Sequence, residues 1–377
     1  MSILHICCNL AGSTVFAQMF EALRDAGAEQ IVFVPEKHAA DMGKNVPDGV
    51  RTHVALTVRP SDALLFYRKA KRTIPAIEAC VDLSGVKLIH AHTLFTDGWI
   101  AQELGEKHHI PYVVTLRYSD IEAIWKYEPH LRRRARAILR SAARVVFLSE
   151  GARQKVLTHW LNKADRALIE PKTAVIPNGL KPEWLDGKAR EGVRAPLRVG
   201  FAGKMNRRKR PLDALAAVHL AAEKGTPCVL RAVGEGKLMN KLVAGLFEGD
   251  SYLGVARDMD AMKRFYADVD VLLVPSTAET FGMVYLEAMS QGVPVLYTRG
   301  QGFDGQFPEG EVGFSVVCGD VKQQAQALAQ VGEHYAARSE RCVQHAAAYA
   351  WPLVAERWLT LYREAQTGGE TQETNEP

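Results

Sequence analysis

Short runs of apolar residues recur through the first half of the chain, separated by longer segments in which apolar residues return every three or four positions. The runs predict strands and the longer segments predict helices. The predicted strands of this half are residues 3–8, 31–35, 86–92, 112–116 and 145–149, and the clearest helical spacing covers residues 15–26. Alternating strands and helices are typical of a parallel, doubly wound sheet with helices on both faces.

A second series of the same kind begins at residue 197. Its predicted strands are residues 197–202, 229–233, 271–275 and 293–297. Between the two series, residues 181–196 are polar and rich in Gly, Pro and charge. We predict an α/β protein with two Rossmann-like domains, residues 1–180 and 197–350, joined by a linker at 181–196. The domains are expected to face a cleft and to bind ligands at the C-terminal ends of their strands.

Composition places the chain among globular proteins. It has 377 residues, of which 47% are hydrophobic and 24% charged, and a net charge of +4 gives no reason to expect nucleic acid as a partner.

The six cysteines form no CxxC pair and no cluster with zinc spacing, so we predict no metal site and a reducing compartment. Without a signal peptide or an apolar run of membrane-spanning length, the expected location is the cytosol or the inner face of a membrane. Residues 367–377 are expected to be disordered.

The segment 275–294 carries the clearest chemical pattern. A predicted strand ends there, a polar turn follows, and a helix is predicted over residues 282–290. The N-terminus of such a helix suits a diphosphate, and Gly282 lets its backbone approach a ligand. Glu279 and Glu287 would lie roughly 12 Å apart on a helix, about the span from ribose to sugar in a nucleotide sugar. On spacing alone, a helix-capping Glu279 and a solvated Glu287 are an equal alternative.

A basic loop follows the predicted strand 197–202. Lys204 and Lys209 precede a helix that is expected to start near Pro211. Cationic side chains beside a helix N-terminus bind anionic oxygens and stabilise a departing diphosphate. We therefore predict phosphate contacts for these two lysines, and a solvated position for Arg207 and Arg210.

Taken together, these segments resemble the retaining glycosyltransferases of family 4, which have the GT-B fold. The pair Glu279 and Glu287 resembles the E-x7-E motif of that family, and residues 201–211 resemble its phosphate loop. Further similar segments are Val233-Gly234-Glu235-Gly236, Tyr252-Leu253-Gly254, Val175-Ile176-Pro177-Asn178-Gly179, Leu148-Ser149-Glu150 and Tyr349-Ala350-Trp351. The resemblance covers nearly the whole chain and is more specific in the second domain.

The resemblance implies that the second domain binds a nucleotide sugar. Glu279 would then bind the sugar, Glu287 the ribose, and Lys204 with Lys209 the leaving phosphates. The residues expected around the nucleotide sugar are Gly12, Gly203, Lys204, Lys209, Gly234, Gly254, Val255, Glu279, Phe281, Gly282, Met283, Val284 and Glu287. It also implies a helix at 351–366 that packs back on the first domain. Retention through a front-face, metal-independent transfer is expected, with no cofactor beyond the co-substrate and a UDP-sugar favoured over a GDP-sugar.

The first domain departs from the family pattern. The family usually has a histidine where Arg117 stands, and Arg117 suits a phosphate or an anionic acceptor instead of a proton. Asp120 is expected to orient Arg117 or to meet an acceptor hydroxyl. His92, at the end of the predicted strand 86–92, is expected to face the acceptor, with a structural role as the alternative. For Gly12, an ordinary turn is an equal alternative. The predicted catalytic residues are Glu279, Lys209, Lys204, Arg117 and His92.

Two basic segments suggest a further partner. Residues 131–144 contain six arginines and no acid, with apolar residues on one helical face, and residues 68–72 are also basic. These surfaces suit an anionic membrane, although a solvated face is an equal alternative.

The predicted function is transfer of a hexose or N-acetylhexosamine to a cell-envelope glycan or lipid-linked acceptor, as in lipopolysaccharide, capsule or exopolysaccharide synthesis. The alternatives are a nucleotide-sugar epimerase of the same fold and an inactive homologue that binds a sugar nucleotide.

Overall fold

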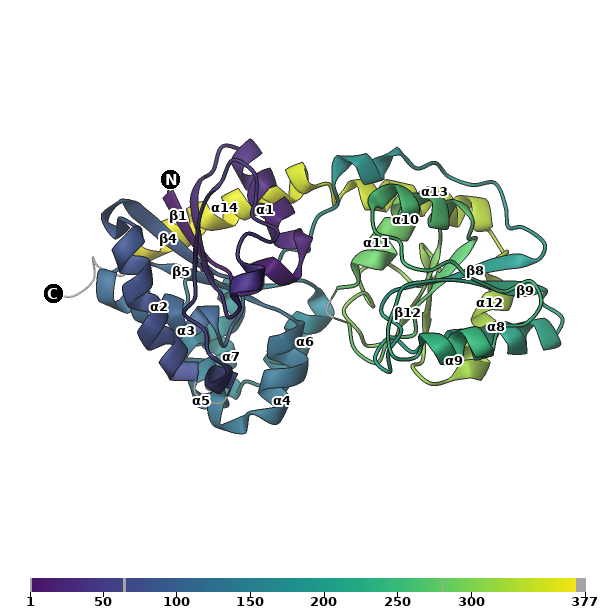
Figure 1. The fold of residues 1–377 in the computed structure, drawn as a ribbon, viewed down its shortest axis with the longest axis horizontal. Helices are drawn as coiled ribbons and strands as arrows, with labels where there is room; N and C mark the ends of the chain where they lie inside the picture. Colours follow the sequence, from purple (N-terminus) through teal and green to yellow (C-terminus); the bar gives the residue numbers. More distant parts are fainter. Residues whose placement is uncertain (1, 64–65, 280, 371–377) are drawn as a thin grey trace. The chain divides into compact units, whose positions relative to one another are not determined.

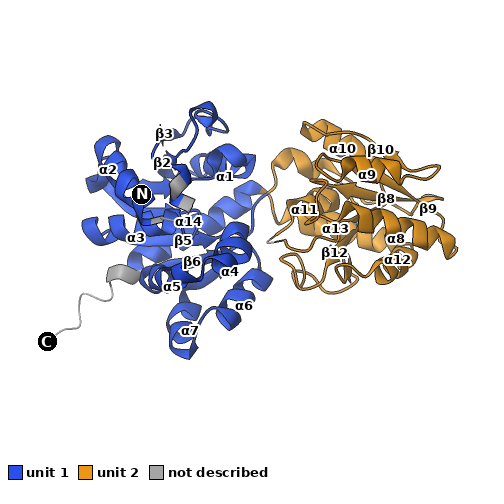
Figure 2. Cartoon of the chain, turned by 60° about the horizontal axis from the view of Figure 1, so that its bottom comes forward, with its two compact units in different colours: residues 1–179, 351–377 blue, residues 180–350 orange. Residues whose placement is uncertain are grey.

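The computed structural model describes residues 2–63, 66–279 and 281–370 and divides into two compact units (Figures 1 and 2). Unit 1 contains residues 1–179 and 351–377, and unit 2 contains residues 180–350. The chain therefore leaves unit 1 once and returns to it for its last helix. No helix in the described part of the chain has the length and hydrophobicity needed to cross a membrane.

Unit 1 is built on a seven-stranded parallel sheet with the order β3-β2-β1-β4-β5-β6-β7. Its strands are β1 (Ser2–Ile6), β2 (Glu29–Pro35), β3 (Arg51–Ala55), β4 (Val86–Ala91), β5 (Tyr112–Leu116), β6 (Arg144–Phe147) and β7 (Thr173–Val175). Its helices are α1 (Thr14–Asp25), α2 (Phe66–Cys80), α3 (Asp97–His108), α4 (Trp125–Tyr127), α5 (Arg132–Ser141), α6 (Glu150–His159), α7 (Lys163–Ile169) and α14 (Trp351–Glu370). All five strands predicted for this half are present, while β3 and β7 were not predicted.

The two faces of this sheet are covered by different helices because neighbouring strand residues point to opposite sides. Ile3 and Val113 pack in a cluster with residues of α1 and α14, whereas Leu4 and Val114 pack in a cluster with residues of α2, α3 and α5. Figure 1 shows α14, the last helix described, lying beside α1. Burial on both faces explains why these strands appear in the sequence as continuous apolar runs.

Unit 2 contains a six-stranded parallel sheet with the order β10-β9-β8-β11-β12-β13. Its strands are β8 (Leu197–Ala202), β9 (Cys228–Val233), β10 (Ser251–Tyr252), β11 (Val271–Leu273), β12 (Val295–Thr298) and β13 (Gly313–Val316). Its helices are α8 (Pro211–Glu223), α9 (Met239–Ala244), α10 (Met259–Ala267), α11 (Met283–Ser290), α12 (Val321–Gln330) and α13 (Tyr335–Ala347). The four predicted strands are confirmed, and β10 and β13 are additional.

In each sheet the strand order reverses at one place. The reversal lies between β1 and β4 in unit 1 and between β8 and β11 in unit 2. Loops that follow such a pair of strands diverge to opposite faces of the sheet and leave a crevice, which is where open α/β sheets bind ligands. The loop after β8 contains Lys204 and Lys209, and the loop after β11 contains Glu279.

The prediction of a linker at residues 181–196 is wrong, because these residues pack on unit 2. Trp184 is buried, and the Arg190 side chain donates hydrogen bonds to the backbone carbonyls of Tyr266 and Gln291. Because the Arg190 side chain satisfies buried carbonyls, the segment 181–196 is part of the fold of unit 2, although its composition resembles that of a loop.

The C-terminal helix belongs to unit 1, together with residues 1–179. The helix α14 extends to Glu370, past the predicted end at residue 366, so residues 367–370 of the predicted disordered tail are helical. The remainder of that tail, residues 371–377, lies outside the described residues.

Candidate active site

Three loops at the C-terminal ends of β8, β9 and β10 are joined by backbone hydrogen bonds. The Gly203 N–H donates to the Val233 carbonyl at 3.1 Å, and the Gly234 N–H donates to the Gly254 carbonyl at 2.8 Å. Gly234 has φ +131°, and a Cβ at this position would lie 1.9 Å from the Gly203 carbonyl oxygen. Only glycine permits this approach. The structure thus brings together three glycines that the sequence predicted to surround a nucleotide sugar.

The loop after β8 also packs against the loop after β11. The Thr277 N–H donates to the Arg208 carbonyl at 2.8 Å. Beside this contact, Lys209 Nζ and Glu279 Oε2 form an ion pair of 2.5 Å, with only 13% and 14% of the two side chains exposed. The backbone N–H of Lys209 is held by Asn206 Oδ1 at 3.0 Å. The predicted phosphate ligand and the predicted sugar ligand are therefore direct neighbours.

The other basic residues of this loop differ from Lys209. Lys204 and Arg207 are exposed, and Arg210 pairs with Asp213 in the first turn of α8 at 2.6 Å. The predicted phosphate contact of Lys204 stays a prediction, since its side chain is not held by a described neighbour. The position of Arg207 is that of a solvated residue.

Helix α11 begins at Met283, so Glu279 precedes it. The helical rise therefore does not set the distance between Glu279 and Glu287, and the separation of roughly 12 Å expected from it is not a property of this helix. Gly282 adopts φ +88° immediately before the helix, where a Cβ would lie 2.5 Å from the Tyr285 ring. Phe281 is only 2% exposed, so its side chain packs inside unit 2, and its predicted contact with the nucleotide sugar stays a prediction.

Glu287 is held in a desolvated position on α11. The Tyr266 hydroxyl of α10 donates to Glu287 Oε2 and to the Val284 carbonyl, both at 3.2 Å. Burial raises the pKa of Glu287 to about 7, although the Tyr266 hydrogen bond and the nearby Lys209 cation lower it. The alternative of a solvated surface acid is therefore wrong.

A cavity of about 270 Å³ lies next to the glycine loops. Its lining residues are Val233, Leu253, Val255, Ala256, Ala261, Arg264 and Phe265. Apolar walls and one cationic side chain suit a flat, polar-edged ring. Val255, predicted to contact the nucleotide, is among these residues. The predicted contacts of Met283 and Val284 stay predictions.

In unit 1, Gly12 ends a short 3₁₀ turn, Leu10–Gly12, after β1. A Cβ at Gly12 would have no heavy atom within 4 Å among the described residues. The position does not require glycine, which supports the alternative of an ordinary turn. Its predicted ligand contact stays a prediction.

Arg117 follows β5 and turns its guanidinium toward the end of β4. Its Nε donates to the His92 carbonyl at 3.1 Å, a terminal nitrogen donates to Asn178 Oδ1 at 3.4 Å, and the group lies 4.2 Å from the centre of the Phe16 ring. Burial lowers the pKa of Arg117. No carboxylate of the described residues lies within ion-pair distance of the guanidinium. Among the described residues of unit 1, Arg117 is thus a partly buried cation that forms no ion pair with a carboxylate.

Asp120 orients Arg117 through the backbone of that residue. Its side chain is fully buried, and its carboxylate accepts the backbone N–H groups of Arg117 at 2.9 Å and Phe95 at 3.3 Å. Burial raises the pKa of Asp120 to about 6. Asp120 therefore fixes the backbone of the loop that carries Arg117, which is the first of its two expected roles, and its contact with an acceptor hydroxyl stays a prediction.

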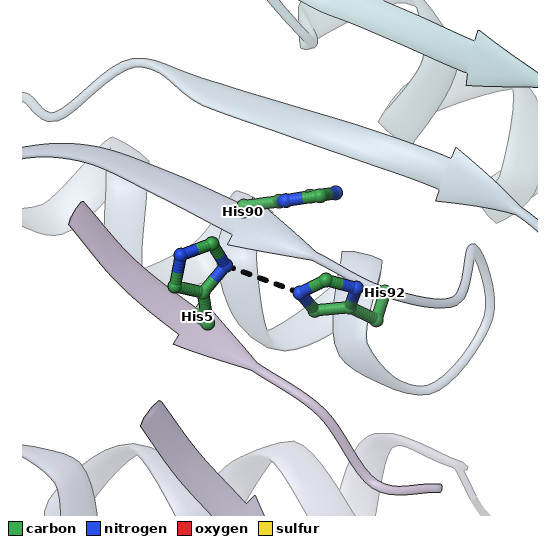
Figure 3. A group of neighbouring side chains, drawn as sticks. All are labelled: His5, His90 and His92. Atoms are coloured by element: carbon green, nitrogen blue, oxygen red, sulfur yellow. Dashed lines mark hydrogen bonds between the residues drawn. The ribbon is translucent and has the colours of Figure 1, made fainter. Parts of the chain in front are cut away.

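His5, His90 and His92 form a buried cluster on β1 and the end of β4 (Figure 3). His5 Nδ1 lies 3.1 Å from His92 Nε2, and the two ring nitrogens of His90 lie 2.8 Å from the Tyr362 hydroxyl and from Thr115 Oγ1. Burial lowers the pKa of all three, that of His5 to about 3, so they are neutral near pH 7.

The prediction that the His92 side chain faces the acceptor is therefore wrong. Its side chain is fully buried, and only its carbonyl contacts Arg117. Among the described residues, the three histidines are the one group whose potential ligand atoms lie together, within 4.8 Å. Because both nitrogens of His90 are already bonded to the core, the cluster supports the structural alternative.

Most arginines of the basic helix α5 are bound within unit 1. Arg132 and Arg136 donate to the carbonyls of Trp125 and Trp160. Arg134 pairs with Glu103 at 3.1 Å, and Arg140 pairs with Asp165. In the second basic run, Lys69 is only 4% exposed and lies 3.9 Å from Asp97 Oδ1. These contacts favour the alternative of a packed face, and contact with a membrane stays a prediction.

Two residues of the site were not predicted. Tyr266 binds Glu287, and Gln301 accepts a hydrogen bond from the Glu279 backbone at 3.0 Å. Both act across more than twenty positions of sequence and belong to no motif, so no local pattern indicates them.

Both units match glycosyltransferase family models. Residues 196–334 match the model described as glycosyl transferases group 1, and residues 11–179 match a glycosyl transferase 4-like domain. The D-inositol 3-phosphate glycosyltransferase of Corynebacterium urealyticum is 30% identical over 226 residues, which cover 55% of this chain and 53% of that relative. The alignment thus spans about half the length of the relative.

Solved structures show the same fold over the whole chain. Sucrose-phosphate synthase from Thermosynechococcus elongatus has a TM-score of 0.75 at 21% identity, covering 97% of this chain and 98% of that one. HepE of Anabaena in complex with UDP-glucose has a TM-score of 0.67 at 17% identity, covering 100% of both chains. The predicted GT-B fold is therefore confirmed.

Proposed function

For this GT-B glycosyltransferase, we propose transfer of a hexose or N-acetylhexosamine from a nucleotide diphosphate sugar, with retention of anomeric configuration and without a metal. The observation that supports it most is the Lys209–Glu279 ion pair beside the loops of Gly203, Gly234 and Gly254. A cation, a carboxylate and close-approaching backbone are the groups that a sugar diphosphate requires.

In this proposal, Lys209 and Lys204 bind the diphosphate, Glu279 binds sugar hydroxyls and Glu287 binds the ribose. The bond from the anomeric carbon to the diphosphate oxygen breaks while the acceptor oxygen attacks the same face. The acceptor proton passes to the departing phosphate oxygen. The lysine cations and the N-terminus of α11 stabilise the charge that develops on the leaving group, which is the basis for proposing metal independence.

A uridine diphosphate sugar is the proposed donor. HepE, a structural neighbour, has been solved with UDP-glucose. The cavity beside Gly254 supplies apolar walls and Arg264 for a base. The acceptor is proposed to be a cell-envelope glycan or a lipid-linked precursor that carries an anionic group. Arg117 supports the anionic group, because it is a partly buried cation with which no carboxylate of the described residues of its unit forms an ion pair.

The function is tested by measuring nucleotide release from UDP- and GDP-sugars with and without glycan and lipid-linked acceptors. A transferase releases nucleotide faster with its acceptor and forms an α-linked product from an α-linked donor, observed by NMR. Inversion at the anomeric carbon would contradict the proposed mechanism. Conversion of the donor to a product with an epimerised sugar, without any acceptor dependence, would favour the epimerase, and binding without turnover would favour an inactive homologue.

Substitution of Arg117 tests the anionic acceptor. Arg117→Leu is expected to raise the KM for a phosphorylated acceptor by about tenfold to a hundredfold, because a charge-assisted contact contributes about 1.5–3 kcal/mol. The preference of the enzyme for the phosphorylated acceptor over its dephosphorylated form should disappear in the variant. Arg133→Leu, an exposed arginine on α5, is the matched control. An unchanged preference in Arg117→Leu would remove the anionic acceptor from the proposal.

A further inference from the structure

The loop after β12, residues 299–307, binds the backbone of Glu279 on both sides. Gln301 Oε1 accepts a hydrogen bond from the Glu279 N–H at 3.0 Å, and the Gly302 N–H donates to the Glu279 carbonyl at 2.7 Å. Glu279 lies between β11 and α11, outside any helix or strand. The backbone N–H and carbonyl of Glu279 are therefore both bonded to one loop that is distant in sequence, and neither belongs to the hydrogen bonds of a helix or sheet.

The loop that holds Glu279 is itself anchored in unit 2. Phe303 is buried, with its ring centre 4.8 Å from that of Tyr285. Gln306 Nε2 donates to the Gly302 carbonyl at 2.8 Å, and the Tyr349 hydroxyl donates to Gln306 Oε1 at 3.0 Å. A loop with an aromatic anchor and two side-chain hydrogen bonds can hold a neighbouring segment in one place.

We propose that Gln301 is a positioning residue for Glu279 in the donor site. The proposal rests on the proposed function, in which the Glu279 carboxylate binds the sugar. That carboxylate is 14% exposed and already paired with Lys209, so its reach toward a sugar is set by the position of its backbone. A misplacement of about 1 Å in a reacting complex lowers the rate by about a hundredfold. Gln301 acts through Glu279 and is not itself a ligand of the sugar.

Hydrogen exchange tests the contact without any ligand. Gln301→Met keeps the length of the side chain and removes the acceptor, whereas Gln301→Glu keeps an acceptor oxygen. In Gln301→Met, exchange of the Glu279 amide in a peptide covering residues 275–282 is expected to become about tenfold faster, because one hydrogen bond is lost. Gln301→Glu should restore most of the protection, and peptides from β8 should exchange as in the wild type. Equal exchange of the Glu279 amide in wild type and Gln301→Met would overturn the proposal.

Kinetics then separate positioning from a general loss of structure. With UDP-glucose as the probe, Gln301→Met is expected to lower kcat for donor turnover about tenfold while the Kd for UDP stays within about twofold, because UDP lacks the sugar that Glu279 binds. In a Glu279→Ala background, Gln301→Met should have little further effect on kcat. An equal loss of UDP affinity, or additive effects of the two substitutions, would contradict positioning. Absence of UDP and GDP binding to the wild type would instead contradict the proposed function. Hydrogen exchange would still show whether Gln301 holds the Glu279 backbone.

Discussion

Lys209→Ala is expected to lower kcat/KM for the nucleotide sugar by about a hundredfold to a thousandfold, the loss typical when one preorganised charge contact to a leaving group is removed. Lys209 is the cation closest to Glu279, and its backbone is fixed by Asn206. The substitution removes the positive charge that stabilises the departing diphosphate. It also leaves the Glu279 carboxylate without its partner. Steady-state kinetics with the donor varied should show both a higher KM and a lower kcat.

The matched control for this prediction is Arg207→Ala. Arg207 carries the same charge two positions earlier in the same loop and is exposed. Its removal should change kcat and KM by no more than about twofold, since solvated surface charges contribute little. Near-normal kinetics of Lys209→Ala, or equal losses in both variants, would show that Lys209 does not contact the phosphates.

Glu287→Ala is expected to raise the KM for the donor by about tenfold to a hundredfold with a smaller change in kcat. A hydrogen bond to a charged group contributes about 1.5–3 kcal/mol, and the ribose contact is made equally before and during the reaction. The exposed acid Glu248, replaced by alanine, is the control. A normal donor KM in Glu287→Ala would place the ribose elsewhere.

The raised pKa of Glu287 adds a dependence on pH. Its ionised form is the better acceptor for two ribose hydroxyls, so nucleotide affinity should rise as pH rises through about 7. Below that value, the Kd for UDP should increase by about tenfold per pH unit. Calorimetry between pH 5.5 and 8.5 measures this, and Glu287→Gln should remove the dependence.

The same group affects stability in the opposite direction. The folded protein binds this proton more tightly than the unfolded chain, because the pKa of Glu287 is raised from 4.5 to about 7. The stabilising contribution of the protonated carboxyl is therefore fully present below pH 4.5 and is lost as pH rises through 7. Ionisation of Glu287 is thus expected to strengthen ribose binding and, in the protein without ligand, to lower the stability of the fold.

Most strands could be predicted from the sequence because both faces of each sheet are buried. The strand at 112–116 is a continuous apolar run and was placed at its observed bounds. Strand β3, by contrast, has the sequence RTHVA and no fully buried residue, so it lacks that signal. Strand β13 begins with a glycine, which is uncommon inside strands. The sequence of residues 181–196 is that of a linker, because the buried contacts of Arg190 are made with carbonyls far along the chain.

The candidate site was predictable in its residue types and not in its contacts. Glu279, Lys209 and the glycines were found through their spacing within motifs. The ion pair between Lys209 and Glu279 joins positions 70 residues apart, and its existence depends on the strand order β8-β11, which no local pattern specifies. For the histidines, the sequence placed His92 at a strand end correctly. The direction in which the His92 side chain points depends on its contact with His5 of β1, which is distant in sequence.

The place of α14 has a consequence for how the protein is made. Trp358 and Tyr362 of α14 complete the core on one face of the unit 1 sheet, against residues such as Ile3 and Val113. These partners are separated by the whole of unit 2 in the order of synthesis. On the ribosome, the earliest strands therefore wait with this apolar face covered only in part, by α1, until unit 2 has emerged. Unit 2 has the first opportunity to finish folding, although it is translated second.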